Sequence, residues 1–272
     1  MKNTSKINER KIAYYEKKTG KKWDENATVL NCSFSRLTVL PELPRGLTEL
    51  YCYSNNLEVL PKLPRGLEIL ECFCNGLKVL PKLPPGLTEL NCTYNGLEVL
   101  PELPHGLTEL NCTYNRLEVL PKLHHGLTEL YCYSNCLKVL PKLPPGLKIL
   151  YCYNNQLSIL PKLPYNLKIL DCSYNNLKVL PTLPRLLKNI DYSYNPLKIY
   201  VEIKGDKNYK YRSKGFIAGK RKYVQMGCHL RLLSEWEKNF WNNNEEFPNN
   251  GSEKSNNRYV RFLEIKNYLD KF

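Results

Sequence analysis

One feature restricts the fold more than any other: a unit of twenty residues recurs along the chain without insertion. Its consensus is L-x-x-L-x-C-x-x-N-x-L-x-x-L-P-x-L-P-x-G, as in LTELYCYSNNLEVLPKLPRG at residues 47–66. The turns begin at Ala27, Leu47, Leu67, Leu87, Leu107, Leu127, Leu147, Leu167 and Leu187. A fixed period of this length is typical of a solenoid, in which each repeat packs only against its neighbours. The first and last turns depart from the consensus, as expected where a solenoid meets its caps.

Each turn divides into a strand and a return segment. On a strand, successive side chains face opposite sides, so Leu50 and Cys52 point inward. Glu49, Tyr51 and Tyr53 then point outward. The L-P-x-L-P segment cannot be a helix, because two closely spaced prolines remove hydrogen-bond donors and fix φ. We therefore predict a parallel sheet on one side and an extended, polyproline-like return path on the other.

Eight of the eleven cysteines occupy the same inward position of successive turns. They are Cys32, Cys52, Cys72, Cys92, Cys112, Cys132, Cys152 and Cys172. Parallel thiols in register have no partner across a loop, and no C-x-x-C pair occurs, so neither disulfides nor zinc is favoured. A buried free cysteine packs as a small apolar side chain. We expect free thiols in a reducing compartment, with no metal and no cofactor.

An asparagine follows the strand at one fixed position of every turn except the first, which has Ser35 there. The series is Asn55, Asn75, Asn95, Asn115, Asn135, Asn155, Asn175 and Asn195. An inward amide at this bend can bond the backbone groups of neighbouring turns that the sheet leaves unpaired. The sequence therefore predicts a structural ladder of asparagines rather than a binding site.

Residues 27–200 are identified as leucine-rich repeats, and the short form with L-P-x-L-P resembles the repeats of type III-secreted bacterial effectors. Similar repeats occur in large DNA viruses of amoebae. The resemblance implies a right-handed solenoid with a parallel sheet on its concave face, an extended convex face and α-helical caps. Some of those effectors carry a C-terminal ubiquitin-ligase domain. Here residues 201–272 are too few for that domain, so we expect no ligase activity.

Function is expected where the turns differ, on the outward strand positions. These show two aromatic patches beside an acidic centre, while lysines such as Lys62 and Lys122 lie in the return path. Tyrosine is a frequent interface anchor, so we predict a partner-binding face for a protein. Its predicted residues are Tyr51, Tyr53, Phe73, Glu89, Glu109, Glu129, Tyr131, Tyr133, Tyr151 and Tyr153. The alternative is a solvated tyrosine ladder, because aromatic residues suit strands.

The two ends of the chain have their own patterns. Residues 1–26 contain a predicted helix over 5–18, ended by Gly20, that covers the first turn together with Trp23. In 201–272, helices are predicted over 228–242 and 258–271, and they either cap the array or dock a partner. A second functional hypothesis is therefore an adaptor whose C-terminal helices recruit a ubiquitin ligase.

A third hypothesis concerns residues 201–222, where eight basic residues stand against two acidic ones. Tyr209, Tyr211 and Phe216 are interleaved with them, a combination that fits nucleic-acid binding. It equally fits an exposed hairpin or loop, and no nucleic-acid motif accompanies it. The net charge of +14 does not decide the matter, since a basic protein attracts acidic proteins, nucleic acids and anionic membranes alike.

No enzyme is predicted, because neither a phosphate loop nor a nucleophile with a base is found. His105, His124 and His125 fall at or beside one repeat position, so His105 and His125 are expected near each other as a surface pair. The first residues carry charge with no apolar stretch behind them, so we expect no secretory signal. No stretch has the length of a membrane span. A cytoplasmic location is expected, in a host cytoplasm if the chain comes from a virus or pathogen; the oligomeric state is left open.

Overall fold

The computed structural model describes residues 2–197, 199–203, 213–218, 221–226, 229–239 and 253–271. Helix α1 (Lys2–Thr19) is followed by nine short strands that pair in chain order, every pair parallel. The strands are β1 (Val29–Asn31), β2 (Glu49–Tyr51), β3 (Ile69–Glu71), β4 (Glu89–Asn91), β5 (Glu109–Asn111), β6 (Glu129–Tyr131), β7 (Ile149–Tyr151), β8 (Ile169–Asp171) and β9 (Asn189–Asp191). The register is one full repeat, as in Leu90 opposite Leu110. The predicted solenoid is confirmed.

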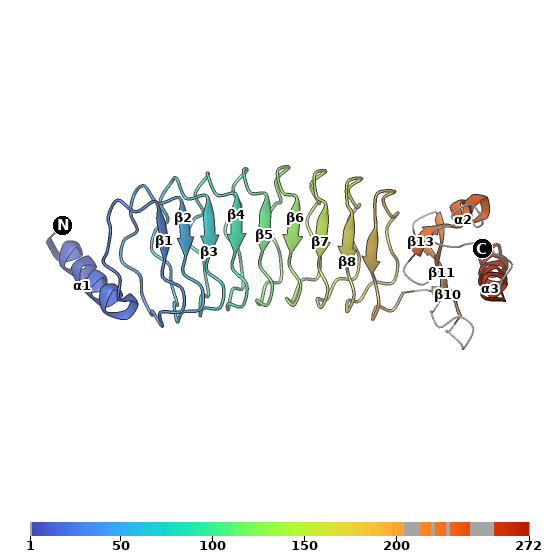
Figure 1. The fold of residues 1–272 in the computed structure, drawn as a ribbon, viewed down its shortest axis with the longest axis horizontal. Coiled ribbons are helices and arrows are strands. Elements are labelled where there is room, and N and C mark those ends of the chain that lie inside the picture. Colours follow the sequence, from blue (N-terminus) through green and yellow to red (C-terminus); the bar gives the residue numbers. More distant parts are fainter. Residues whose placement is uncertain are drawn as a thin grey trace.

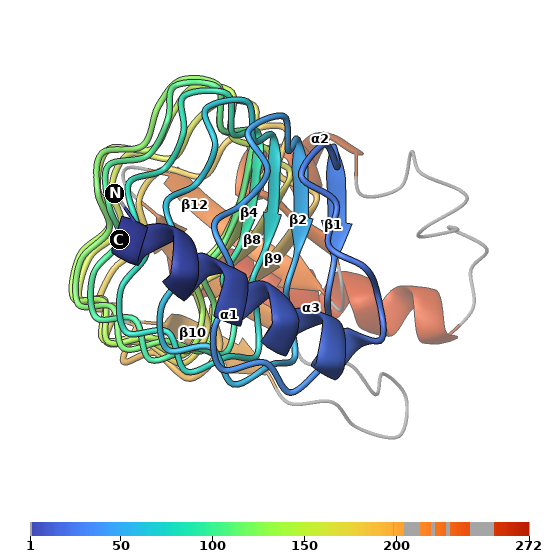
Figure 2. The same ribbon diagram turned by 90° about the vertical axis from the view of Figure 1, so that its left-hand side faces the viewer.

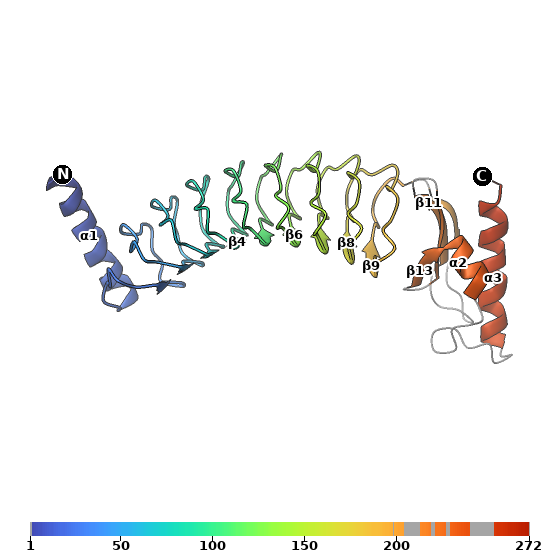
Figure 3. The same cartoon turned by 90° about the horizontal axis from the view of Figure 1, so that it is seen from above.

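The coil forms a long row of turns with α1 at one end and a smaller unit at the other (Figure 1). Seen from above, the row bends into an arc, and the strands lie along its inner side (Figure 3). The proline-rich return segments form the outer side. The sheet therefore provides the concave face, as the resemblance to leucine-rich repeats implies.

The inward positions form one continuous apolar core along the array. In the fifth turn, Leu110, Cys112 and Leu117 are completely buried, and Leu107, Leu120 and Leu123 are nearly so. Burial of each such leucine contributes about 1.5–3 kcal/mol to folding. The eight repeat cysteines are equally buried and unpaired, which agrees with their predicted role in packing.

The asparagine ladder joins each turn to the one before it. The side-chain amide of Asn175 donates to the carbonyl oxygens of Cys152, Cys172 and Ser173 at 3.0, 3.2 and 3.1 Å. Its own carbonyl oxygen accepts from the backbone N–H of Leu157 at 2.9 Å. One buried side chain thus satisfies four backbone groups of two successive turns, and the prediction of a structural ladder is confirmed.

Helix α1 covers the open end of the first turn, across which it lies in the end-on view (Figure 2). Tyr15 enters the core and packs edge-to-face on Trp23, with ring centroids 5.0 Å apart. Asn8 Oδ1 accepts from the backbone N–H of Glu42 at 2.8 Å. The helix begins earlier than the predicted residue 5 and ends at Gly20, whose φ of 69° suits a glycine.

The C-terminal unit contains a second sheet that the sequence did not predict. Its antiparallel strands run in chain order and are followed by two helices. The elements are β10 (Ile199–Ile203), β11 (Ser213–Ala218), β12 (Arg221–Met226), β13 (His229–Leu232), α2 (Leu233–Asn239) and α3 (Glu253–Leu269). The helix predicted to start at residue 228 is wrong over 229–232, which form a strand. Leu230 and Leu233 have a spacing that suggested a helix. Leu230 lies in β13 and Leu233 in α2, because the strand runs directly into the helix.

This second sheet, rather than the two helices, covers the last turns of the array. Phe216, Ala218 and Tyr223 join the core of the array, and Ala218 bridges to Leu180. The opposite side of the sheet packs on α2 and α3, where Trp236 Nε1 donates to the carbonyl oxygen of Val224 at 2.8 Å. Adjacent residues of β12 thus point to opposite sides, one toward the array and one toward the helices.

We predict that Asn175→Ala lowers the free energy of unfolding by at least about 2 kcal/mol, because a buried backbone group that loses its partner costs about 1–3 kcal/mol. Urea denaturation followed by circular dichroism measures this change. The matched control is Asn176→Ala, since Asn176 is exposed and uses only its backbone N–H, which donates to Leu157 at 2.8 Å. Equal losses in the two variants would contradict the structural role of the ladder.

Reaction with thiols gives a second test of the packing. Burial raises the pKa of the Cys92 and Cys132 thiols to about 12, so they hold almost no thiolate near neutral pH. We predict that an alkylating reagent modifies exposed Cys74 in the native protein and leaves the eight repeat cysteines untouched until denaturant is added. Peptide mass spectrometry locates the modified thiols. Rapid native labelling of Cys92 would contradict this prediction.

Candidate functional site

We number each turn from 1 to 20 so that Leu47 has position 1. Side chains at positions 3, 5, 7 and 8 of the turns make up the concave face. All ten residues of the predicted partner-binding face lie on it. Glu89 is exposed and the other nine are half-buried against their neighbours. The structure therefore brings the predicted residues onto one continuous surface.

An aromatic ladder runs along this face, with one ring in every turn at position 7 or position 8. Its members are Phe34, Tyr53, Phe73, Tyr94, Tyr114, Tyr133, Tyr153, Tyr174 and Tyr194. Rings at the same position stack in parallel, with centroids 4.1 Å apart in the Tyr94–Tyr114 and Tyr133–Tyr153 pairs. A step from position 8 to position 7 gives an edge-to-face contact, as between Tyr114 and Tyr133 at 5.4 Å.

The two positions are complementary within a turn. Where position 7 is aromatic, position 8 is Ser, Cys or Asn; where position 8 is aromatic, position 7 is Ser or Thr. Tyr94 and Tyr114 therefore continue the aromatic ladder across the centre of the face. The sequence had suggested that this centre was polar. Strict alternation cannot place position 8, because the strand has already ended there. The signal that could have found these two residues is the recurrence of one aromatic residue per turn.

Position 8 has a left-handed backbone in every turn, with φ from 50° to 56°. This conformation suits glycine or asparagine and costs other residues about 1–2 kcal/mol. Five of the nine positions nevertheless hold an aromatic residue, and Phe34 and Tyr194 are 74% and 70% exposed. Local conformation and burial do not explain these rings; four of them stack in pairs, Tyr94 on Tyr114 and Tyr174 on Tyr194, both with centroids 4.1 Å apart.

The charge of the concave face has a single sign. No lysine or arginine occupies position 3, 5, 7 or 8 of any turn. The carboxylates at these positions are Glu49, Glu71, Glu89, Glu109, Glu129, Asp171 and Asp191. None of the ion pairs among the described residues includes one of them. Although the chain has a net charge of +14, the charged side chains of the concave face are all acidic.

Hydrogen bonds within the face hold some of these carboxylates in place. The phenol groups of Tyr51 and Tyr131 donate to Glu49 and Glu129 at 2.8 and 2.7 Å. Partial burial, followed by repulsion from neighbouring glutamates, raises the pKa of Glu71 and Glu109 above the ordinary value of 4.5. Burial and the bond to Glu129 also raise the pKa of Tyr131. The face therefore carries negative charge that no ion pair among the described residues neutralises.

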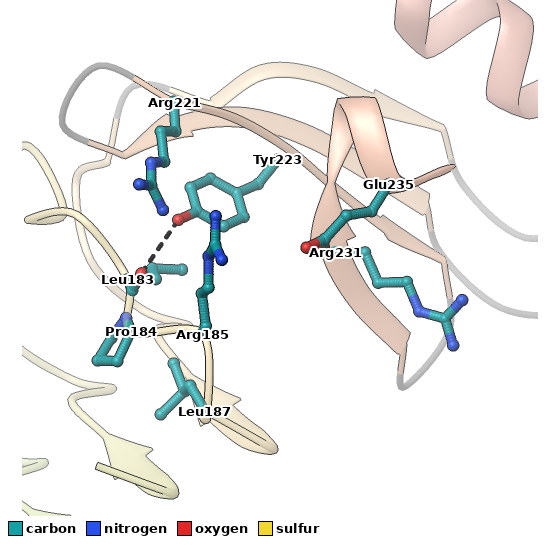
Figure 4. Close-up of a pocket in the computed structure, with 8 residues that line it drawn as sticks. All are labelled: Leu183, Pro184, Arg185, Leu187, Arg221, Tyr223, Arg231 and Glu235. Carbon is teal, nitrogen blue, oxygen red and sulfur yellow. Dashed lines mark hydrogen bonds between the residues drawn. The ribbon is translucent and has the colours of Figure 1, made fainter. Parts of the chain in front are cut away.

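A small pocket lies between the array and the C-terminal sheet (Figure 4). Arg185 and Arg221 lie on either side of Tyr223, whose hydroxyl donates to the carbonyl oxygen of Leu183 at 3.3 Å, while Arg231 points away. The free volume of about 50 Å³ suits a few water molecules and is far below that of a usual ligand pocket.

A larger hollow of about 670 Å³ lies on the outer side of the first two turns. Its charged groups are Glu42, Arg45, Lys62 and Arg65, all at exposed positions. No buried polar group converges there, so nothing in this hollow points to catalysis.

The histidines and the basic segment differ from expectation in detail. The ring of His105 contacts that of His124, with centroids 3.9 Å apart, because His124 replaces the proline that precedes the turn's bend. Among the described residues no group of three or more metal-binding side chains occurs.

Phe216 is buried in the core, so its proposed part in a nucleic-acid footprint is wrong. Tyr209 and Tyr211 lie outside the described residues.

Comparison with solved structures places this geometry in a family. YopM from Yersinia enterocolitica WA-314 is 39% identical and superposes with a TM-score of 0.64, covering 70% of this chain and 42% of that one. YopM of Yersinia pestis, a leucine-rich effector protein, is 30% identical with a TM-score of 0.51 and covers 71% of each chain. The chain is a leucine-rich-repeat protein.

The leucine-rich-repeat domain of a Shigella effector is 26% identical with a TM-score of 0.47, covering 72% of this chain and 84% of that one. The sequence profile of the Leucine Rich Repeat matches residues 166–190. No curated protein sequence matches this leucine-rich-repeat chain. It spans less than half the length of the Y. enterocolitica YopM. Among the described residues, no helix is long and apolar enough to cross a membrane.

We predict that Glu71→Gln raises the melting temperature at neutral pH. Because the folded pKa of Glu71 lies above its unfolded value, the folded state binds more protons between the two values and loses stability as pH rises. The gain should disappear below the ordinary value of 4.5. Melting curves over a pH series measure it. The control Glu118→Gln removes an exposed carboxylate that pairs with Lys138 at 3.6 Å. If Glu71→Gln raised the melting temperature equally at all pH values, the raised pKa of Glu71 would be contradicted.

Proposed function

We propose that this protein is a non-enzymatic scaffold that binds a partner protein through its concave face. The observation that carries the proposal is the set of aromatic and acidic side chains on that face, where every turn has one ring at position 7 or 8 and no lysine or arginine occupies position 3, 5, 7 or 8. The outer side lacks such a pattern and carries most of the array's lysines, for example Lys62 and Lys122. The concave face and the outer side of the array thus differ in chemistry, and this difference favours the concave face as the surface that binds a partner.

The densest part of the face lies on turns six and seven. Tyr131 stacks on Tyr151 with ring centroids 5.5 Å apart, and Tyr133 stacks on Tyr153 at 4.1 Å. The bond from Tyr131 to Glu129 fixes one of these rings further. Such tyrosines are held in place before binding, so they lose little side-chain entropy when a partner contacts them. This group supports a role as the energetic centre of the interface.

The similar structures supply a setting for the proposal. The Y. pestis YopM is a leucine-rich effector protein, and the repeats of this chain share its fold. We propose an effector-like action in the cytoplasm of a host cell, where the unpaired thiols would stay reduced. For nucleic-acid binding through 201–222 and for recruitment of a ubiquitin ligase, no observation among the described residues speaks in favour.

A photo-cross-linking amino acid in place of Glu89 should capture a partner from host-cell extract, whereas the same residue in place of Lys122 should not. Glu89 lies on the concave face and Lys122 on the outer side, and both are exposed. Mass spectrometry identifies the captured protein. Equal capture from both positions, or capture from Lys122 alone, would place the interface elsewhere.

Once the partner is purified, Tyr131→Ala and Tyr153→Ala should each weaken its binding by about 1–2 kcal/mol, the usual loss for an interface anchor. Isothermal titration calorimetry measures the affinity, and circular dichroism checks the fold. Tyr165→Ala is the control, because Tyr165 is an exposed residue of the return path. Unchanged affinity in both concave variants would reject the tyrosine patch.

A further inference from the structure

Resting on the proposed function, we infer that the partner docks an extended segment with two arginines about seven residues apart, a spacing set by the rise of about 3.3 Å per extended residue. Each arginine binds at a break in the aromatic ladder where a carboxylate stands beside an uncovered ring face.

The aromatic ladder is interrupted at two places. No ring contact joins Phe73 to Tyr94, and none joins Tyr153 to Tyr174, although all four residues are described. Both steps run from position 7 of one turn to position 8 of the next, where the rings no longer lie opposite each other. Each interruption leaves ring faces that no other ring covers.

A carboxylate stands at each break. At position 5, Glu71 shares a turn with Phe73, and Asp171 shares a turn with Tyr174. Across the array, position 5 is acidic only in these two turns and in the last one, at Asp191; elsewhere it is Asn or Tyr. The carboxylates of position 5 therefore coincide with the breaks, and no carboxylate of that row lies between them.

Both carboxylates keep an oxygen free. Glu71 Oε2 accepts from Asn91 Nδ2 at 2.9 Å, and Asp171 Oδ1 accepts from the backbone and side chain of Ser173 at 3.0 and 2.7 Å. Their other oxygens, Oε1 and Oδ2, accept no hydrogen bond from the described residues. These bonds fix the orientation of each carboxylate while leaving an acceptor for an incoming donor.

Arginine fits such a place better than lysine. Its planar guanidinium stacks on an aromatic ring face and presents donors in a fixed fork to a carboxylate. An ammonium group lacks both the plane and the fork. Between the breaks, the position 3 carboxylates Glu89, Glu109 and Glu129 add attraction for a cationic chain. A cation would also relieve the repulsion that Glu71 and Glu109 experience.

The spacing follows from the geometry of the coil. The two carboxylates, Glu71 and Asp171, are five turns apart, which at about 4.8 Å between neighbouring strands is about 24 Å. An extended chain that rises about 3.3 Å per residue covers this distance with about seven residues. A segment lying along the array can therefore reach both breaks, whereas two arginines much closer together can occupy only one.

The test uses the full chain and a short fluorescent peptide with two arginines at this spacing, and fluorescence anisotropy measures binding. Replacing both arginines by citrulline keeps their shape and removes their charge, and it should weaken binding by more than about tenfold, or 1.4 kcal/mol. A peptide with the arginines two residues apart should lose a similar factor, because it reaches a single break. Equal binding of the citrulline peptide, or no binding of the arginine peptide at millimolar protein, would overturn the inference.

Variants of the protein locate the contacts. Glu71→Gln and Asp171→Asn should each weaken the arginine peptide by about tenfold, and Glu118→Gln, which removes the same charge from the outer side, should not. Melting curves show whether each variant is folded. An equal effect of all three substitutions would mean that only overall charge matters, and this would also overturn the inference.

The outcomes also separate this inference from the proposed function. If the arginine peptide fails while the cross-linker at Glu89 still captures a partner that Tyr131→Ala weakens, the concave face binds a protein of different chemistry. If the peptide does not bind and the cross-linker captures nothing, both the proposed function and this inference are contradicted. If the peptide binds as expected, the arginine spacing can be searched for in the captured partner.

Discussion

The structure depends on one repeated interaction, the buried asparagine side chain that joins two successive turns. A strand of three residues cannot satisfy the backbone at the bend that follows it. The amide of Asn175 supplies the missing bonds to four backbone groups. Because each turn after the first has this arrangement, inward positions are nearly invariant along the array, and variation is confined to the outward ones.

The residues at the outward positions vary from turn to turn, but the variation follows a pattern. One ring per turn, placed at position 7 or 8 but never at both, produces stacking between turns without crowding within a turn. Rings such as Tyr94 and Tyr174 occupy a left-handed backbone at φ near 50°, which opposes folding. Uncompensated carboxylates on the same wall also oppose folding. Both features are costs for the isolated chain, and a cationic, extended partner would offset both.

The sequence predicted the scaffold well because period and packing are local. A twenty-residue repeat with fixed leucines, cysteines and asparagines leaves a single way to bury them, so the solenoid, its register and the ladder followed from the pattern. The ten predicted residues of the face lie where alternation placed them, although their role in binding stays a prediction. Position 8 was missed because its left-handed φ directs Tyr94 and Tyr114 to the concave side, and alternation along a strand does not extend to that bend.

The C-terminal unit was less predictable for the opposite reason. It has no repeat, and its apolar residues serve two different cores. Tyr223 packs toward the array and Val224 toward the helices, so neighbouring apolar residues of β12 give no clear period. The strand β13 runs directly into α2, and the joined segment gave a helical pattern in which the strand could not be recognised. Tertiary contact with the last turns, rather than local preference, determines this part.

The most direct test of the account is a comparison of side-chain oxidation by hydroxyl radicals in the free protein and in complex with its captured partner, resolved by mass spectrometry. The account predicts that rings of the aromatic ladder, such as Tyr94 and Tyr174, become protected, while Val119 and Tyr165 on the outer side, both exposed, react as before. Protection of Val119 and Tyr165 with the ladder still reactive would contradict the account.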